Sequence, residues 1–145
     1  MRMQVLTPLR RFMLLLLALL PTLLLGACAT KRNDDLKSTL YAYQSMIRWG
    51  DFEQAATLVD PDYLAKHPIS RLDWERYRQV QVSGYRASDP VQINEFEIQI
   101  AAEIEFVNIH TQSPRSIVDR QVWRYHSDSK RWLLSTGLPD LSGGR

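Results

Sequence analysis

The only thiol in the chain belongs to Cys28, which directly follows two small residues, Gly26 and Ala27. Residues 12–25 form an apolar run of Leu, Met and Ala with few interruptions, and the arginines before them are Arg2, Arg10 and Arg11. A positive head, an apolar run and small residues, in that order, are typical of a secretory signal peptide. The run of about 14 residues is shorter than the roughly 20 that a membrane-spanning helix needs. We therefore predict that residues 1–27 are a signal peptide that is cleaved, which places a thiol at the start of the mature chain.

The motif Leu25-Gly26-Ala27-Cys28 resembles the lipobox of bacterial lipoproteins. The resemblance implies cleavage between Ala27 and Cys28, a diacylglyceryl group on the cysteine sulfur and an acyl chain such as palmitate on the new amine. Two or more acyl chains, at about 0.8 kcal/mol per buried methylene, hold a protein firmly in a bilayer. Ala29 in place of Asp resembles the class sorted to the outer membrane, so the expected location is the periplasmic face of that membrane. The alternatives are an ordinary cleaved signal with an incidental cysteine, or an uncleaved anchor.

Asp119 is the polar residue whose position could support catalysis. Alternation along its predicted strand places Asp119 and Gln121 on the same side as Ile117, Trp123 and Tyr125. A carboxylate facing an apolar pocket has a raised pKa, which suits a general base. In that interpretation Tyr125 is the candidate proton donor. The alternative is structural: an ion pair with an arginine of the helical half (Arg71, Arg76 or Arg78), or a place near an open rim.

No other residue set predicts a catalytic, metal or cofactor site. His67, His110 and His126 are far apart in the sequence and lack ligand spacing. A row of glutamates could bind cations. Arg120 and Arg124 have the opposite parity from Trp123 and could face these glutamates across the sheet, so a solvated salt-bridge ladder on paired strands is favoured. The Trp and Tyr residues are expected to pack in the core and rim. The glutamates of the row are Glu95, Glu97, Glu103 and Glu105.

The mature chain is a single small domain with little net charge. Removal of residues 1–27 leaves 118 residues with 15 basic and 16 acidic side chains, a formal charge of −1. Nucleic-acid binding needs a basic surface, so it is not expected. Once Cys28 carries lipid, no disulfide can form. We expect residues 28–33 to be a lipidated tether, residues 34–139 one domain and residues 140–145 a flexible tail.

The first half of the domain shows helical patterns. Leu36, Leu40, Tyr43 and Ile47 follow at steps of four, three and four, which is one helical face ending at Gly50. Asp51 is expected to cap a second helix, and Asp60-Pro61 to begin a short third one. Residues 72–77 are expected to form a fourth.

The second half alternates with period two, as strands do. From Phe96 to Phe106 every second residue is apolar, and Glu97, Gln99, Glu103 and Glu105 occupy positions between them. Gly84 suggests a bulge or bend, and the change of parity at Phe106-Val107 suggests a second bulge. Two closing strands follow, around Trp123 and Trp132.

Helices followed by a long antiparallel meander predict an α+β domain, with N-terminal helices on a strongly curved sheet of about four strands. This layout resembles the cone-shaped superfamily of nuclear transport factor two and ketosteroid isomerase. The resemblance rests on Trp49-Gly50-Asp51-Phe52, the long strand 95–110 and the closing strands 119–125 and 131–134. It implies a curved sheet that wraps a helix and often leaves an apolar pocket. Members of that superfamily include enzymes, ligand binders and protein-binding modules, so the fold does not choose a function.

The favoured functional hypothesis is therefore a lipid-anchored, non-catalytic domain that binds an envelope protein or a small apolar ligand, and that needs no cofactor. The alternative is a small isomerase or dehydratase that uses Asp119. A purely structural subunit of an envelope complex is a third possibility. The outer sheet face is predicted to be charged, which favours a monomer over a dimer formed through that face.

Overall fold

The computed structural model describes residues 30–142. The predicted signal peptide, its cleavage site and the predicted lipidation at Cys28 lie outside the described residues. The chain separates into two compact units, residues 1–37 and 38–145. Of the first unit, residues 30–37 are described, and they are helical. The fold discussed below is that of the second unit.

Four helical segments precede the sheet in the second unit, as the sequence predicted. Residues 38–49 form a helix whose Tyr43 and Ile47 side chains are fully buried. It ends at Gly50, whose positive φ of 75° is easily adopted by glycine. Three short helices follow, α2 (Phe52–Ala56), α3 (Pro61–Lys66) and α4 (Arg71–Tyr77).

Each short helix begins at a side chain that accepts a hydrogen bond from a free backbone N–H. The Asp51 carboxylate accepts from the amide of Gln54, and the Asp60 carboxylate accepts from the amide of Asp62. Ser70 and Asp73 form a reciprocal capping box at the start of α4. These caps satisfy amides that a short helix would otherwise leave without partners.

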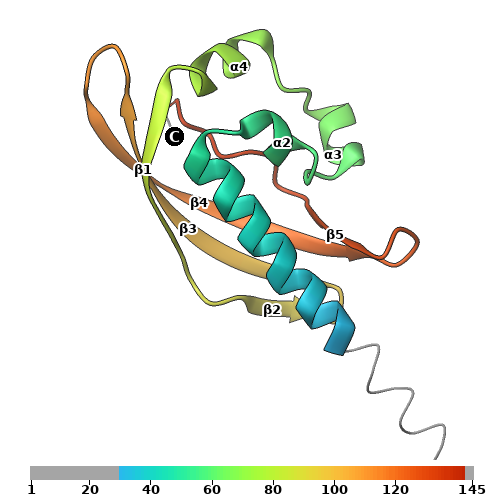
Figure 1. The fold of residues 1–145 in the computed structure, drawn as a ribbon. Coiled ribbons are helices and arrows are strands. Elements are labelled where there is room, and N and C mark those ends of the chain that lie inside the picture. Colours follow the sequence, from blue (N-terminus) through green and yellow to red (C-terminus); the bar gives the residue numbers. More distant parts are fainter. Residues whose placement is uncertain (1–29, 143–145) are drawn as a thin grey trace, which may run out of the picture. The chain divides into compact units, whose positions relative to one another are not determined.

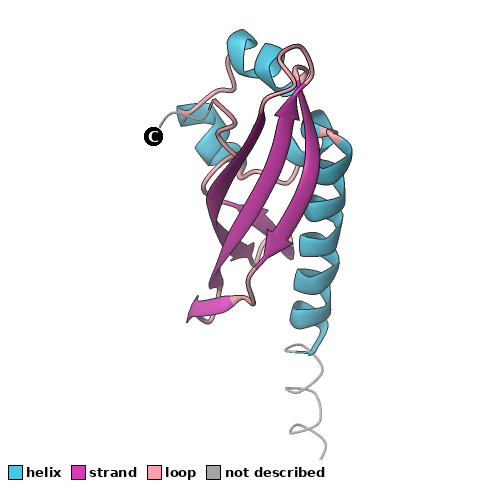
Figure 2. Ribbon diagram, turned by 90° about the vertical axis from the view of Figure 1, so that its left-hand side faces the viewer, coloured by secondary structure: helices cyan, strands magenta, loops and turns pink. Residues whose placement is uncertain are grey.

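The sheet is antiparallel and strongly curved, and the helix of residues 38–49 lies along one of its faces (Figures 1 and 2). The strand order is β1-β3-β4-β5, and the short β2 pairs with β3 beyond the end of β1. The predicted α+β fold, with helices on a curved sheet about four strands wide, is confirmed. The strands are β1 (Val80–Ala87), β2 (Val91–Asn94), β3 (Glu97–Asn108), β4 (Pro114–His126) and β5 (Arg131–Leu134).

The core lies between the helices and the inner sheet face. In β3 the even-numbered residues from Ile98 to Phe106 are buried, and the odd-numbered ones are half-buried. This alternation confirms the predicted strand. Trp123 on β4 packs edge-on against Tyr43 of the helix, with ring centroids 5.1 Å apart.

One of the two predicted bulges is present and the other is not. The register of β1 against β3 shifts between Val82 and Gly84, as Gly84 suggested. The bulge predicted at Phe106-Val107 is wrong, because β3 and β4 stay in register as far as the pair Val107 and Pro114. Val107 is an apolar residue on the outer face of β3, and the strand ends at the next residue, Asn108.

The β5 edge of the sheet is tied to the helical half by backbone pairing. The amide of Leu134 donates to the carbonyl of Leu58, and the amide of Asp60 donates to the carbonyl of Leu134, both at 2.8 Å. A parallel bridge between Val59 and Leu134 results. The segment between α2 and α3 therefore covers the β5 edge.

Candidate ligand-binding site

Asp119 lies in a polar network on the helix-facing side of β4. The Gln121 side-chain amide donates to the Asp119 carboxylate and to the Tyr85 hydroxyl, both at 2.9 Å. The Trp123 indole N–H donates to the Gln121 side-chain carbonyl at 3.1 Å. Gln121 is buried, so both ends of its amide are satisfied within the protein.

Strand geometry explains why these residues meet. Asp119, Gln121 and Trp123 alternate along β4 and therefore point to one face. Tyr85 is opposite Ile104 in β3, and Ile104 is in turn opposite Ile117 in β4. Tyr85 therefore reaches the same face from two strands away. The predicted parity of Asp119 and Gln121 is confirmed.

Burial raises the pKa of Asp119 to about 6 from an ordinary value of 3.8, and the hydrogen bond from Gln121 opposes that rise. Burial also raises the pKa of Tyr43 and of Tyr77, and the negative charge of Asp119 adds to both increases. The hydroxyl of Tyr43 is buried and has no hydrogen-bond partner among residues 30–142. Asp119 thus lies in a buried environment, close enough to several phenols for its charge to raise their pKa.

Tyr125, the donor proposed from the sequence, does not join this network. It is six residues further along β4, which corresponds to roughly 20 Å at about 3.3 Å per residue. Its ring packs near Phe96 and Trp132, with centroid distances of 6.5 and 5.4 Å. The structure instead places the Tyr85 hydroxyl next to the Gln121 side chain. Sequence alternation does not predict this contact, because the bulge at Gly84 changes which face of the sheet the later residues of β1 point to.

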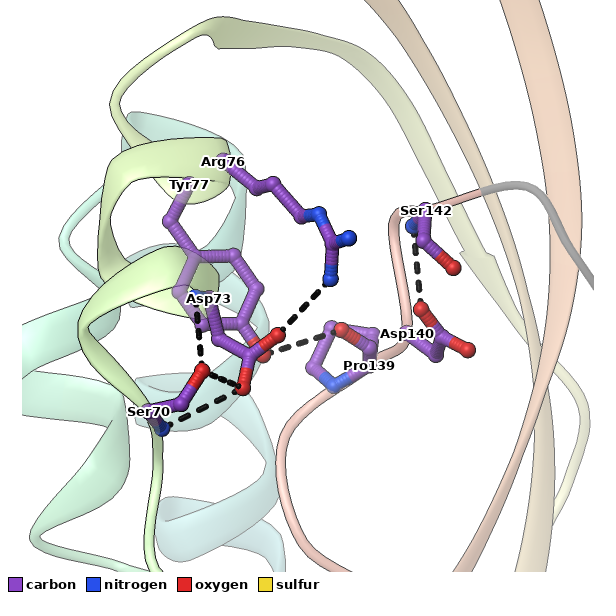
Figure 3. Close-up of polar contacts among 7 residues, drawn as sticks. All are labelled: Ser70, Asp73, Arg76, Tyr77, Pro139, Asp140 and Ser142. Carbon is purple, nitrogen blue, oxygen red and sulfur yellow. Dashed lines mark hydrogen bonds and ion pairs between the residues drawn. The ribbon is translucent and has the colours of Figure 1, made fainter.

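A cleft of about 400 Å³ lies between α3, α4 and the C-terminal segment of residues 137–142, hereafter the C-terminal segment. Figure 3 shows that Asp73 accepts from Ser70 and from Arg76 at its α4 side. The Tyr77 hydroxyl crosses to the C-terminal segment and donates to the Pro139 carbonyl at 3.1 Å. Hydrogen bonds from Ser70 and from Arg76 lower the pKa of Asp73. The cleft therefore has charged side chains held in fixed orientations.

The opposite wall of this cleft is aromatic. The rings of Tyr63 and His67 stack at 4.5 Å on α3. Gly137 approaches the Tyr63 ring so closely that a Cβ atom there would be 2.6 Å from the ring. Tyr63, His67 and Gly137 all line the cleft. Sequence reasoning did not find this site, because its residues come from three separate segments without a common motif.

We expect Gly137→Ala to lower the free energy of unfolding by about 2 to 4 kcal/mol, because it adds a clash to the strain of a positive φ. The φ of Gly137 is 79°. Gly50→Ala is the matched control: its φ is 75°, but no atom lies within 4 Å of the added carbon. It should cost only about 1 kcal/mol. Urea unfolding of the two variants measures both losses, and equal losses would contradict the proposed contact with Tyr63.

The three histidines are not gathered into one site. His67 lies on the cleft wall, His110 follows β3, and His126 Nε2 is 3.1 Å from the carboxylate of Asp60. Between residues 30 and 142, no group of three or more His, Cys, Asp or Glu side chains could hold a metal ion.

The outer face of the sheet carries the predicted salt-bridge ladder in altered form. Arg124 bonds Glu97 across β3 and β4 at 2.9 Å, as expected. Glu103 and Glu105 pair with Arg86 of β1 rather than with Arg120, which is opposite Ala101. Exposed pairs of this kind each contribute about 0 to 1 kcal/mol.

The chain folds as an α+β domain in which helices cover one face of a curved antiparallel sheet. No protein-family model, curated protein or solved structure matches this chain. In the part of the chain described here, no helix has the length and apolar character needed to cross a bilayer.

Proposed function

We propose that this protein is a lipid-anchored binding domain of the bacterial cell envelope, of the nuclear transport factor two-like kind. Acylated Cys28 holds it at the periplasmic face of the outer membrane. The cleft between α3, α4 and the C-terminal segment binds its ligand, either a small molecule or a segment of an envelope protein. The domain acts without catalysis.

The observation that carries the binding role is the cleft itself. Its volume of about 400 Å³ lies within the range of roughly 300 to 1,000 Å³ common for ligand pockets. An aromatic wall faces charged side chains across it, which suits a ligand with both apolar and polar parts. By contrast, the Asp119 carboxylate is engaged by Gln121 in a separate network.

The anchor predicts a modified mass. Protein from the membrane fraction should have the mass of residues 28–145 plus acyl chains, because the lipobox-like motif directs lipid to the Cys28 sulfur. Intact mass spectrometry measures this, and Cys28→Ala should give a product without acyl chains. An unmodified wild-type product cut at another position would remove the anchor from the proposal.

The cleft is tested by blocking it. Leu64 lines the cleft, whereas Leu72 is exposed on α4 and does not. Native mass spectrometry of gently extracted protein should detect a bound species in wild type and in Leu72→Trp. That species should be lost in Leu64→Trp. Equal retention in both variants would show that binding occurs elsewhere.

A second candidate function is an enzyme that uses Asp119 as a general base. The raised pKa of about 6 favours it, as does the Tyr43 hydroxyl, which has no hydrogen-bond partner within residues 30–142. If it is correct, Asp119→Asn should abolish conversion of a metabolite by the purified full chain while the variant remains folded. Unchanged metabolite profiles with wild type and variant would exclude this role for Asp119 in that metabolite set.

A further inference from the structure

A second cleft, of about 330 Å³, lies where α4, β1, the β3–β4 turn and the C-terminal segment meet. It shares Arg76 and Ser142 with the first cleft. Its apolar lining comes from Val80, Phe106 and Leu141. Phe106 and Leu141 are almost completely buried, so they provide a rigid apolar floor.

The charged lining residues of this second cleft are both arginines, Arg76 and Arg115, and none of its lining residues is acidic. Arg115 is opposite Phe106 in the sheet, so its side chain leaves the same face. Its guanidinium donates to the carbonyl of Ser142 at 3.2 Å and forms no ion pair within residues 30–142. Arg76 pairs with Asp73, which lines only the first cleft. The second cleft therefore carries an excess of positive charge.

Asn108 adds a neutral donor. Its side-chain carbonyl accepts from the amides of His110 and Thr111, at 3.0 and 3.1 Å. Because both partners are donors, the orientation of the amide is determined, and its NH₂ group remains available as a donor.

We infer that this second cleft binds a small amphiphilic anion. One carboxylate or phosphate group lies against Arg115, Arg76 and the Asn108 amide, and a short apolar chain lies on Phe106 and Leu141. Guanidinium groups bind such oxyanions through two parallel charge-assisted hydrogen bonds. The same chemistry belongs to a free organic acid or phosphate ester and to a lipid headgroup. This inference does not depend on the first cleft or on the anchor.

The test ligand is monobutyl phosphate. Inorganic phosphate and 1-butanol are the comparison ligands, since each carries only its anionic group or only its apolar chain. The full chain in dodecyl maltoside should bind monobutyl phosphate at least about tenfold more tightly than either half, as measured by calorimetry. Arg115→Gln should weaken this binding by about tenfold, because one charge-assisted contact is lost. Arg120→Gln is the matched control, since Arg120 is exposed on the opposite face of the same strand, and its affinity should stay within about twofold of wild type.

Equal affinity of wild type and Arg115→Gln, or butanol binding as tightly as the ester, would overturn the inference. If Arg115→Gln does not fold, NMR of the wild type decides: shifts of the Asn108 and Leu141 amides on titration support the site, and shifts confined to other residues overturn it. Phosphatidic acid nanodiscs distinguish the two sources. If monobutyl phosphate binding is lost in phosphatidic acid nanodiscs but kept in phosphatidylcholine nanodiscs, the lipid headgroup occupies the site. If monobutyl phosphate binds equally in both, the site is assigned to a free ligand.

Discussion

Replacing Trp123 with alanine should lower the free energy of unfolding by about 3 to 5 kcal/mol, the usual cost of emptying a large aromatic site in a core. Trp123 is 0% exposed, and its ring packs edge-on against Tyr43. The substitution also removes the donor to Gln121, whose side-chain carbonyl would remain buried without that partner. Urea unfolding of the full chain followed by circular dichroism measures the loss.

Val118→Ala is the control for this prediction. Val118 is on the same strand but is 61% exposed on the other face. Its replacement should change stability by no more than about 0.5 kcal/mol. If Trp123→Ala lowered the free energy of unfolding as little as Val118→Ala, the described packing of Trp123 against Tyr43 would be contradicted.

Asp119→Asn should stabilise the protein at pH 8 by about 1 to 3 kcal/mol and should change its pH dependence. In the folded chain the pKa of Asp119 is about 6, above its ordinary value of 3.8. Folding therefore favours the protonated carboxyl group. The contribution of Asp119 is most favourable below pH 4, falls as the pH rises to about 6 and is constant above that. A shift of about two pKa units corresponds to about 3 kcal/mol.

The measurement is the stability difference between variant and wild type from pH 3.5 to 8. It should be near zero at the acid end and should grow through pH 4 to 6, because asparagine keeps an acceptor for Gln121 but carries no charge. Asp128→Asn, in the exposed β4–β5 turn, is the control, and its free energy of unfolding should vary with pH as that of the wild type does. A difference that does not vary with pH would show that Asp119 is not desolvated in the folded state.

Local patterns predicted most of the fold, because short-range physics determines them. The alternation of residues 96–106 shows which side of β3 faces the core, and the capping residues Asp51 and Asp60 show where short helices begin. The bulge predicted at Phe106-Val107 is absent because a strand keeps its register when an apolar residue such as Val107 occupies its outer face. Leu141 is buried beyond the predicted end of the domain at residue 139, and only tertiary packing determines its place.

The candidate sites could be predicted only in part. Parity placed Asp119 beside Gln121 correctly, but the tyrosine that joins them, Tyr85, comes from β1, whose register depends on a bulge. Both clefts combine segments that are distant in the sequence. The hydrogen bond from Tyr77 to Pro139 joins residues 62 positions apart. No local pattern contains such a contact, so no reading of single segments could find the clefts.

The backbone bridge between Val59 and Leu134 has a consequence for cooperativity. Since Leu58 and Asp60 hydrogen-bond to Leu134, α2 and α3 cannot separate from the sheet without breaking these two backbone hydrogen bonds. The helical and sheet parts should therefore lose native structure in one transition rather than in two stages. Amide hydrogen exchange should report similar opening free energies for Asp60 and Leu134, and a much lower value for Asp60 alone would mean that the helices unfold independently.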